Sequence, residues 1–271
     1  MRETPAALQL LVPVLAVFIA IGLVGGGLLL MDPGAGDPRA DGPVPPARHD
    51  TRAGHVEVGD RRVTQADIER RTARYDRRRR ARFFTWDVAG RSPATATAQG
   101  TGAGHYFVNG FLVGFRPFAA DHPTVPRAVL ARRKTYQRDR VQYDGRGDVW
   151  QTSREAWIAP RGDCEDHALI LADWLIEMGL DTRVAVGTHD GGGHAWVVVI
   201  GDDGGQYLLE ATDKRSRHRA LPRAGLASGY RPSLQFDREH FWVNTGSRGT
   251  RDYAGDHWQR RSRFVRAASG A

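Results

Sequence analysis

The chain contains one cysteine, Cys164, within the run Arg161–His167. Thiolate is the reactive form of cysteine, and the free N–H groups at the start of a helix stabilise its negative charge. An apolar pattern of helical period begins at this cysteine, and His194 and Glu210 follow it in the chain. A thiol, a histidine that takes its proton and an acid that orients the histidine together make a cysteine nucleophile. A buried, unreactive thiol is the structural alternative.

The helix that must carry the thiol is predicted over Cys164–Gly179. Its apolar residues recur three and four positions apart from Ala168 onwards, so Cys164 lies on the same buried face. Asp163 suits the N-cap position, and Gly179 suits the C-terminal end of the helix. The thiol is therefore expected in the first turn of a helix that packs on the core.

The histidine and the acid must come from neighbouring strands. His194 begins one predicted strand, which ends at Ile200, and Glu210 lies in the next, Gln206–Thr212. A two-residue turn between these strands would place the two side chains on opposite faces of the sheet. A three-residue turn, Asp202–Gly204 with its last glycine in the left-handed conformation, places them on one face. We therefore predict the three-residue turn.

The roles of the three residues follow from proton transfer. His194 takes the thiol proton, and Glu210 accepts a hydrogen bond from the other ring nitrogen, with Asp213 as the alternative acid. The thiolate of Cys164 attacks an amide carbonyl, a thioester forms, and water or an amine resolves it. This chemistry requires no cofactor.

The oxyanion that forms during the attack also needs hydrogen-bond donors. Backbone N–H groups at the helix start, including that of Cys164, are expected to supply them. Gln142 and Trp157 are the upstream side chains considered as an additional donor.

Two motifs carry a family resemblance. The run Gly162–Asp166 (GDCED) at a helix start and the run Gly193–Val197 (GHAWV) at a strand start resemble the transglutaminase-like branch of the papain fold. The first run is similar, more specifically, to the bacterial transglutaminase-like cysteine proteinases, over about Arg127–Ala220. The resemblance implies an α+β fold, with the nucleophile at a helix N-terminus packed on an antiparallel sheet that carries the histidine and the acid. The family usually has aspartate where this chain has Glu210.

The same resemblance implies a calcium site beside the nucleophile. Asp163 and Glu165 match the acidic positions of that family, and calcium prefers oxygen ligands. Helix capping is the alternative role of Asp163.

The N-terminal part of the chain predicts a membrane anchor. Leu8–Met31 is uncharged and apolar, and as a helix it would span about 36 Å, enough to cross a bilayer. Together with the resemblance, this segment predicts a single-pass protein of the bacterial inner membrane, with the catalytic domain in the periplasm or outside the cell.

Composition gives little indication of a nucleic-acid partner. The 271 residues carry a formal net charge of +8, and all but two of the 39 basic residues are arginines, the exceptions being Lys134 and Lys214. That bias can reflect the composition of a genome, and no nucleic-acid motif accompanies it. We expect no nucleic-acid binding.

The sequence divides into five predicted segments. They are an anchor (1–31), a Pro/Gly-rich linker (32–60), an Arg-rich helical and hairpin part (61–125), a transglutaminase-like core (126–245) and a basic tail (246–271). Within them we expect a loop at Ser92–Gly104, a hairpin turn at Asn109–Gly110, a helix over Arg127–Val141 and a frayed C-terminal end.

These inferences predict a membrane-anchored thiol hydrolase that cleaves an amide bond in a protein, and a protein of the cell surface or envelope is the expected substrate. Two alternatives remain open. One is transfer of the acyl group to an amine, as in a transglutaminase. The other is a noncatalytic transglutaminase-like module that binds a partner of the cell envelope.

Overall fold

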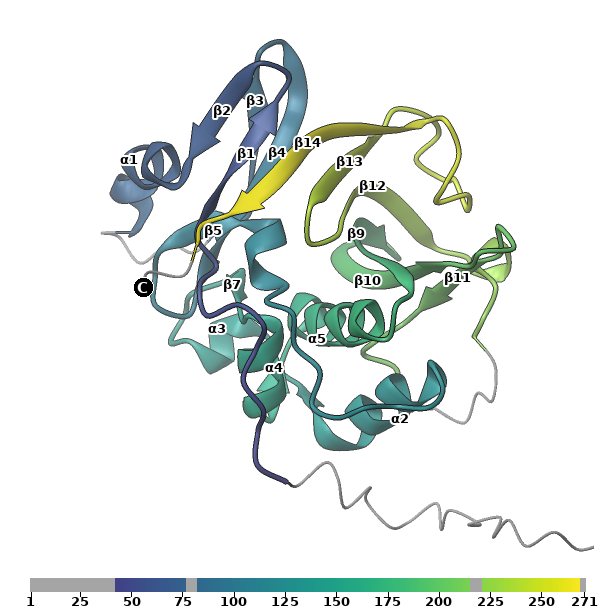
Figure 1. Cartoon of the computed structure of the whole chain (residues 1–271). Coiled ribbons are helices and arrows are strands. Elements are labelled where there is room, and N and C mark those ends of the chain that lie inside the picture. The colour runs from purple at the N-terminus through teal and green to yellow at the C-terminus, as the bar shows by residue number, and fades with distance from the viewer. Residues whose placement is uncertain (1–41, 77–81, 215–220, 269–271) are drawn as a thin grey trace, which may run out of the picture. The chain divides into compact units, whose positions relative to one another are not determined.

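The computed structural model describes residues 42–76, 82–214 and 221–268 (Figure 1). Its helices are α1 (Gln65–Asp76), η2 (Val108–Phe111), α2 (Thr124–Arg133), α3 (Asp139–Gln142), α4 (Ser153–Ile158), α5 (Cys164–Glu177) and η3 (Ala224–Leu226). Its strands are β1 (Gly54–Val58), β2 (Arg61–Thr64), β3 (Phe84–Val88), β4 (Arg91–Gly100), β5 (His105–Phe107), β6 (Thr135–Tyr136), β7 (Val149–Trp150), β8 (Arg161–Gly162), β9 (Asp181–His189), β10 (Gly192–Ile200), β11 (Gln206–Leu209), β12 (Tyr230–Phe236), β13 (His240–Asn244) and β14 (Trp258–Arg266).

The main sheet has eight strands in the order β11-β10-β9-β12-β13-β14-β1-β2, and each neighbouring pair is antiparallel. Helix α5 packs against β9 and β10 (Figure 1). A second sheet joins β3, β4 and β5 to β7, and β6 pairs with β8. The predicted α+β class, with the cysteine helix on an antiparallel sheet, is confirmed.

Helix α5 forms because an almost continuous run of apolar side chains is buried along it. Trp174 is fully buried and meets Phe118 and Trp157 edge to face, with ring centroids 4.8 and 5.8 Å apart. The helix ends at Glu177, and Gly179 follows in the left-handed conformation at φ +87°. The predicted helix and its glycine stop are therefore confirmed.

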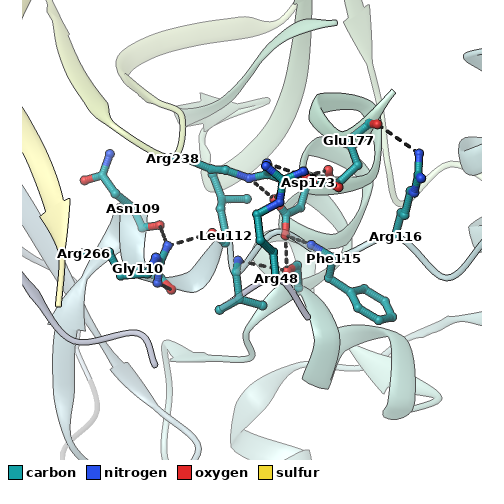
Figure 2. A network of polar contacts seen from close by, with 12 residues as sticks. Arg48, Asn109, Gly110, Leu112, Phe115, Arg116, Asp173, Glu177, Arg238 and Arg266 are labelled. Atoms are coloured by element: carbon teal, nitrogen blue, oxygen red, sulfur yellow. Dashed lines mark hydrogen bonds and ion pairs between the residues drawn. The ribbon is translucent and has the colours of Figure 1, made fainter. Parts of the chain in front are cut away.

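A buried carboxylate fixes the second half of α5 in place (Figure 2). Asp173 is fully buried and accepts hydrogen bonds from the backbone N–H of Phe115 at 2.9 Å and from the hydroxyl of Ser153. Arg238, from the turn between β12 and β13, donates from Nε to Asp173 at 2.6 Å and pairs with Glu177 at 2.7 Å. Three segments that are far apart in sequence thus meet on one helix.

Both ends of the described chain belong to the folded unit. The sequence had instead predicted a linker over 32–60 and a tail over 246–271. The main chain of Arg48 bonds to Gly114 at 2.9 Å, and β1 enters the main sheet. At the other end, β14 lies between β13 and β1, and Arg266 donates to the carbonyls of Gly110 and Leu112 (Figure 2). The described residues all belong to one compact unit.

Three local predictions were wrong. The expected loop Ser92–Gly104 is largely β4, a strand that lies between β3 and β5 and whose small side chains are mostly buried. The expected hairpin turn at Asn109–Gly110 is the 3-10 helix η2. The expected helix Arg127–Val141 is interrupted, because α2 ends at Arg133 and β6 intervenes before α3.

The predicted anchor Leu8–Met31 lies outside the described residues. Within the part of the chain that the structure describes, no helix combines the length and the apolar character needed to cross a membrane.

Asp173→Asn tests the anchoring of α5. Neutralising this carboxylate leaves Arg238 in a largely buried site without its main partner, which is expected to lower the free energy of unfolding by about 3 kcal/mol. In a domain of this size the thermal midpoint should fall by roughly 10 °C. The matched control is Arg48→Gln, because Arg48 is exposed in its pair with Glu177 and should contribute less than about 1 kcal/mol. Equal losses in both variants would contradict the argument.

Candidate active site

Cys164 is the first residue of α5 and is half-buried. Asp163 occupies the N-cap position in extended conformation, but its side chain makes no capping hydrogen bond to α5 within the described residues. Its Oδ2 instead accepts from the backbone N–H of Asp139 at 3.4 Å. Side-chain capping by Asp163 was therefore a wrong alternative, and the first N–H groups of α5 have no side-chain cap.

The turn between β10 and β11 has the predicted register. The N–H of Gly201 donates to the carbonyl of Gly205 at 2.7 Å, and Gly204 is left-handed at φ +73°. Val197 pairs with Leu209, so Glu210, just beyond β11, falls opposite Trp196 on the face that carries His194. The three-residue turn is confirmed.

This register brings the histidine and the acid together. His194 Nε2 lies 2.8 Å from Glu210 Oε2. The other carboxylate oxygen, Oε1, accepts from the N–H of Thr212 at 3.0 Å and from its hydroxyl at 2.7 Å. Glu210 is therefore held in one orientation, with one oxygen directed at the imidazole.

The charges of this pair support each other. Burial by itself would lower the pKa of His194, but the adjoining Cys164 and Glu210 side chains outweigh it and raise that pKa to about 10. Burial would raise the pKa of Glu210, but the bonds from His194 and Thr212 lower it to about 2. An imidazolium beside a carboxylate is thus the favoured state at neutral pH.

Cys164 and His194 line one cavity of about 510 Å³, called the Cys164 cleft below. Sγ of Cys164 also lies 3.3 Å from Glu165 Oε2. The aromatic and small residues that line the cleft include Phe83, Tyr136, Trp150, Gly187, Gly193 and Ala195. The charged residues that line it include Arg138, Asp139, Arg140 and Asp148.

Tyr230 is a site residue that sequence reasoning missed. Its hydroxyl donates to Glu210 Oε2 at 2.9 Å, the same oxygen that faces His194. Its ring stacks on His189 with centroids 4.1 Å apart. Burial and the nearby carboxylate raise the pKa of Tyr230, so the hydroxyl stays a donor. No local pattern marks this residue, because it reaches the site through the long-range pairing of β12 with β9.

Other candidates named from sequence take different places. Asp213 pairs with Arg127 at 3.2 Å, so it does not replace Glu210 as the acid. Trp157 is buried in the core against Trp174, and Gln142 bonds to the Tyr143 hydroxyl. Neither Trp157 nor Gln142 lines the Cys164 cleft, so neither is placed to hold an oxyanion.

A cluster of three carboxylates lies beside the nucleophile. Asp163 and Glu165 are joined by Asp139 of α3, and ligand atoms of all three lie within 4.8 Å of one another. Each has one buried carboxylate oxygen, Oδ1 or Oε1, without a hydrogen-bond partner among the described residues. Burial and the neighbouring charges raise the pKa of Asp139 to about 7 and that of Glu165 well above its ordinary value. Unpartnered oxygen donors at this spacing fit a hard cation such as calcium.

One of the two lysines supports the segment before the thiol. Lys134 is 2% exposed, and its ammonium group donates 2.8 to 3.1 Å hydrogen bonds to three main-chain carbonyls, those of Ala156, Ala159 and Arg161. A Cβ on Gly162 would lie 2.8 Å from this nitrogen, so glycine is needed there. Burial lowers the pKa of Lys134 to about 8, although Asp166 partly offsets that effect.

The other lysine connects the loop after Glu210 to the helix. Lys214 Nζ donates to the main-chain carbonyl of Lys134 and lies 3.3 Å from His167 Nε2. Burial lowers the pKa of His167 to about 3, so its ring is neutral and can accept this bond. The two lysines therefore hold together the segments that carry the thiol and the acid.

Sequence comparisons match part of the chain to a centrosomal protein. A family model described as the CEP76 peptidase-like domain matches residues 148–253. Centrosomal protein of 76 kDa is 43% identical over 77 residues in Mus musculus and in Homo sapiens, and 37% identical over 79 residues in Xenopus tropicalis. Each match covers 28% of this chain and 12% of the relative. The chain therefore spans only a small part of the length of these relatives.

Among solved structures, calcium-bound LapG from Legionella pneumophila matches with a TM-score of 0.38 and 17% identity, over 50% of this chain and 74% of that chain. The sequence matches correct the predicted location. The relatives are named as centrosomal proteins, which contradicts the expectation of a bacterial inner-membrane protein with a periplasmic or extracellular domain.

The pKa values of His194 and Glu210 predict how stability depends on pH. The His194 contribution is complete below its ordinary value of 6.5 and is lost as pH rises through about 10. The Glu210 contribution is complete above 4.5 and is lost as pH falls through about 2. His194→Gln should therefore cost most between pH 4.5 and 6.5, about 2 kcal/mol after allowance for solvent screening. Urea denaturation at pH 5.5 and pH 10 measures this cost, and equal costs at both values would contradict the assignment.

Asp139→Asn tests the carboxylate cluster. The wild-type chain is expected to bind calcium, measured by isothermal titration calorimetry, and to unfold at a higher temperature when calcium is present. Removing one of three carboxylate ligands should weaken binding by roughly tenfold or more. Asp148→Asn is the matched control, because Asp148 lines the cleft outside the cluster. Identical binding by all three proteins would exclude this site.

Proposed function

We propose that the chain is a thiol peptidase that cleaves an amide bond of a protein through a thioester on Cys164. The observation that carries the proposal is the 2.8 Å pair of His194 and Glu210, placed with Cys164 around one cleft at the start of a buried helix. A structural histidine would not need an acid fixed by Thr212 and Tyr230. The family-model description, a peptidase-like domain, agrees with this reaction class.

The proton transfers use the two ring nitrogens separately. Nε2 of His194 is engaged by Glu210, which leaves Nδ1 to take the proton of the Cys164 thiol. The sulfur then attacks the scissile carbonyl carbon, and the C–N bond breaks as the imidazolium returns its proton to the leaving amine. Water, deprotonated by the same imidazole, attacks the thioester and releases the acid product and the thiol.

The tetrahedral intermediate needs donors for its oxyanion. The backbone N–H groups of the first turn of α5 point along the helix axis toward its N-terminus, and Asp163 does not cap them. These groups can bind a developing negative charge beside the sulfur, where the helix dipole also favours it.

We propose that Asp139, Asp163 and Glu165 are ligands of a calcium ion. When bound, the ion supplies positive charge beside the first turn of α5 and joins α3 to it. The residues of the chain themselves perform the proton transfers. Two of these ligands flank Cys164 directly, so their orientation also fixes the backbone that presents the thiol.

Thiol labelling and peptide cleavage test the proposal together. The wild-type chain should react with a thiol-directed probe faster than its urea-denatured form, and His194→Ala should remove this advantage. A proteome-derived peptide library should yield cleavage products with the wild type, while Cys164→Ala should reduce their rate of formation by ~10³-fold or more. Glu210→Gln should retain more activity than His194→Ala, because Glu210 orients the base, His194, but does not itself accept the proton.

The same preparation separates the alternatives. Incorporation of a labelled primary amine into glutamine-containing peptides, with little hydrolysis, would favour acyl transfer to amines. Labelling of Cys164 at the denatured rate together with no cleavage would instead favour a noncatalytic binding module. Cleavage that persists in Cys164→Ala would exclude the thiol mechanism.

A further inference from the structure

Two exposed arginines lie at the edge of the Cys164 cleft. Arg138 and Arg140 flank Asp139 at the start of α3, and both line the cleft together with Tyr136. We call these three residues, Tyr136, Arg138 and Arg140, the α3 rim. Tyr136 is 45% exposed, so the rim offers an aromatic surface as well as two guanidinium groups.

The side chains of these two arginines make no polar contact that would stabilise the described part of the fold. Within the residues that the structure describes, neither side chain forms an ion pair or a hydrogen bond. The buried arginines of the chain differ, since Arg127 pairs with Asp213 and Arg266 binds several main-chain carbonyls. Long cationic side chains lose conformational entropy when they are ordered, so two unpaired ones beside a cleft are available to a ligand.

The side chain of Arg140 passes close to Gly147. Its Nε lies 3.6 Å from the point that a Cβ of Gly147 would occupy, and Gly147 itself lines the cleft. Asp148 is an exposed acid nearby. It forms no ion pair with Arg140 among the described residues, but the charge of Arg140 partly offsets the rise in the pKa of Asp148 that burial causes.

The acids of the carboxylate cluster are more buried than the arginines of the rim. Asp139 is 2% exposed and Glu165 is 6% exposed, and with Asp163 they form the carboxylate cluster described above. A cation bound there would balance these acids. A ligand that approaches from solvent thus meets the two arginines of the rim and the exposed Asp148 before it meets the buried acids.

We infer that the substrate is a peptide segment with acidic side chains next to the scissile bond, bound through the α3 rim; this inference rests on the proposed peptidase function. Arginine binds carboxylates through paired N–H donors, which suits Asp or Glu side chains one to a few residues from the bond that Cys164 attacks. Small residues also line the cleft, namely Gly187, Gly193 and Ala195, and they leave room for the peptide main chain beside His194.

Cleavage of matched peptides tests the inference. A good site is first taken from the peptide-library digest, and peptides are then made in which the flanking acidic residues are kept, changed to the neutral amides or changed to lysine. The wild-type kcat/KM should be about tenfold higher for the acidic peptide than for the amide peptide, mainly through KM, and the ratio should fall as salt is raised. The lysine peptide should be the poorest substrate.

Variants assign the preference to the rim. In the double variant Arg138→Gln/Arg140→Gln, the kcat/KM for the acidic peptide divided by that for the amide peptide should fall to about one. Arg132→Gln is the matched control, because Arg132 is exposed on α2 and does not line the cleft, and its ratio should stay near that of the wild type. Thermal unfolding of each variant shows whether it is folded.

The outcomes separate the two proposals. If the protein neither cleaves peptides nor shows enhanced labelling of Cys164, the peptidase function fails. If it cleaves the library with no preference for acidic peptides, or with a preference for basic ones, the peptidase function stands and this inference is overturned. A single-stranded oligonucleotide that binds through Arg138 and Arg140, with no acidic preference in cleavage, would likewise overturn it.

Discussion

A single buried charge sets the geometry of this protein. Helix α5 is covered on nearly all sides, and its carboxylate Asp173 has no access to water. A buried carboxylate is tolerated only when hydrogen bonds and a counter-charge replace its hydration. Here the partners are Phe115, Ser153 and Arg238, each from a different part of the chain. Satisfying Asp173 therefore fixes those three segments around the same helix that begins with the thiol.

The parts of the site that depend on local pattern were predictable from sequence. The apolar period of α5 and the choice of turn between β10 and β11 are properties of short segments, and together they bring Glu210 onto the face of His194. Tyr230 and Asp139 were not predicted. Each reaches the site through a long-range arrangement, the pairing of β12 with β9 in one case and the single turn of α3 in the other.

Strand pairing in the two sheets explains the larger errors of the sequence-based predictions. Strand β4 consists mostly of small and polar residues, which give little hydrophobic signal although most of its side chains are buried. Strand β14 is rich in arginine and resembles a solvated tail, yet it lies inside the main sheet because β13 and β1 provide partners on both sides. The match to the peptidase-like family model covers residues 148–253, so it includes Cys164, His194, Glu210 and Tyr230 but not Asp139 or the α3 rim.

The scarcity of lysine has a chemical consequence. A thioester can be attacked by any accessible amine, including the side chains of the protein that forms it. This chain has only two lysines. Lys134 is enclosed by carbonyl groups, and Lys214 is bonded to Lys134 and His167. Every other basic side chain is a guanidinium or an imidazole. If the proposed thioester forms, the lysine amines of the chain that could attack it are therefore limited to two, of which Lys134 is buried and Lys214 is exposed but hydrogen-bonded.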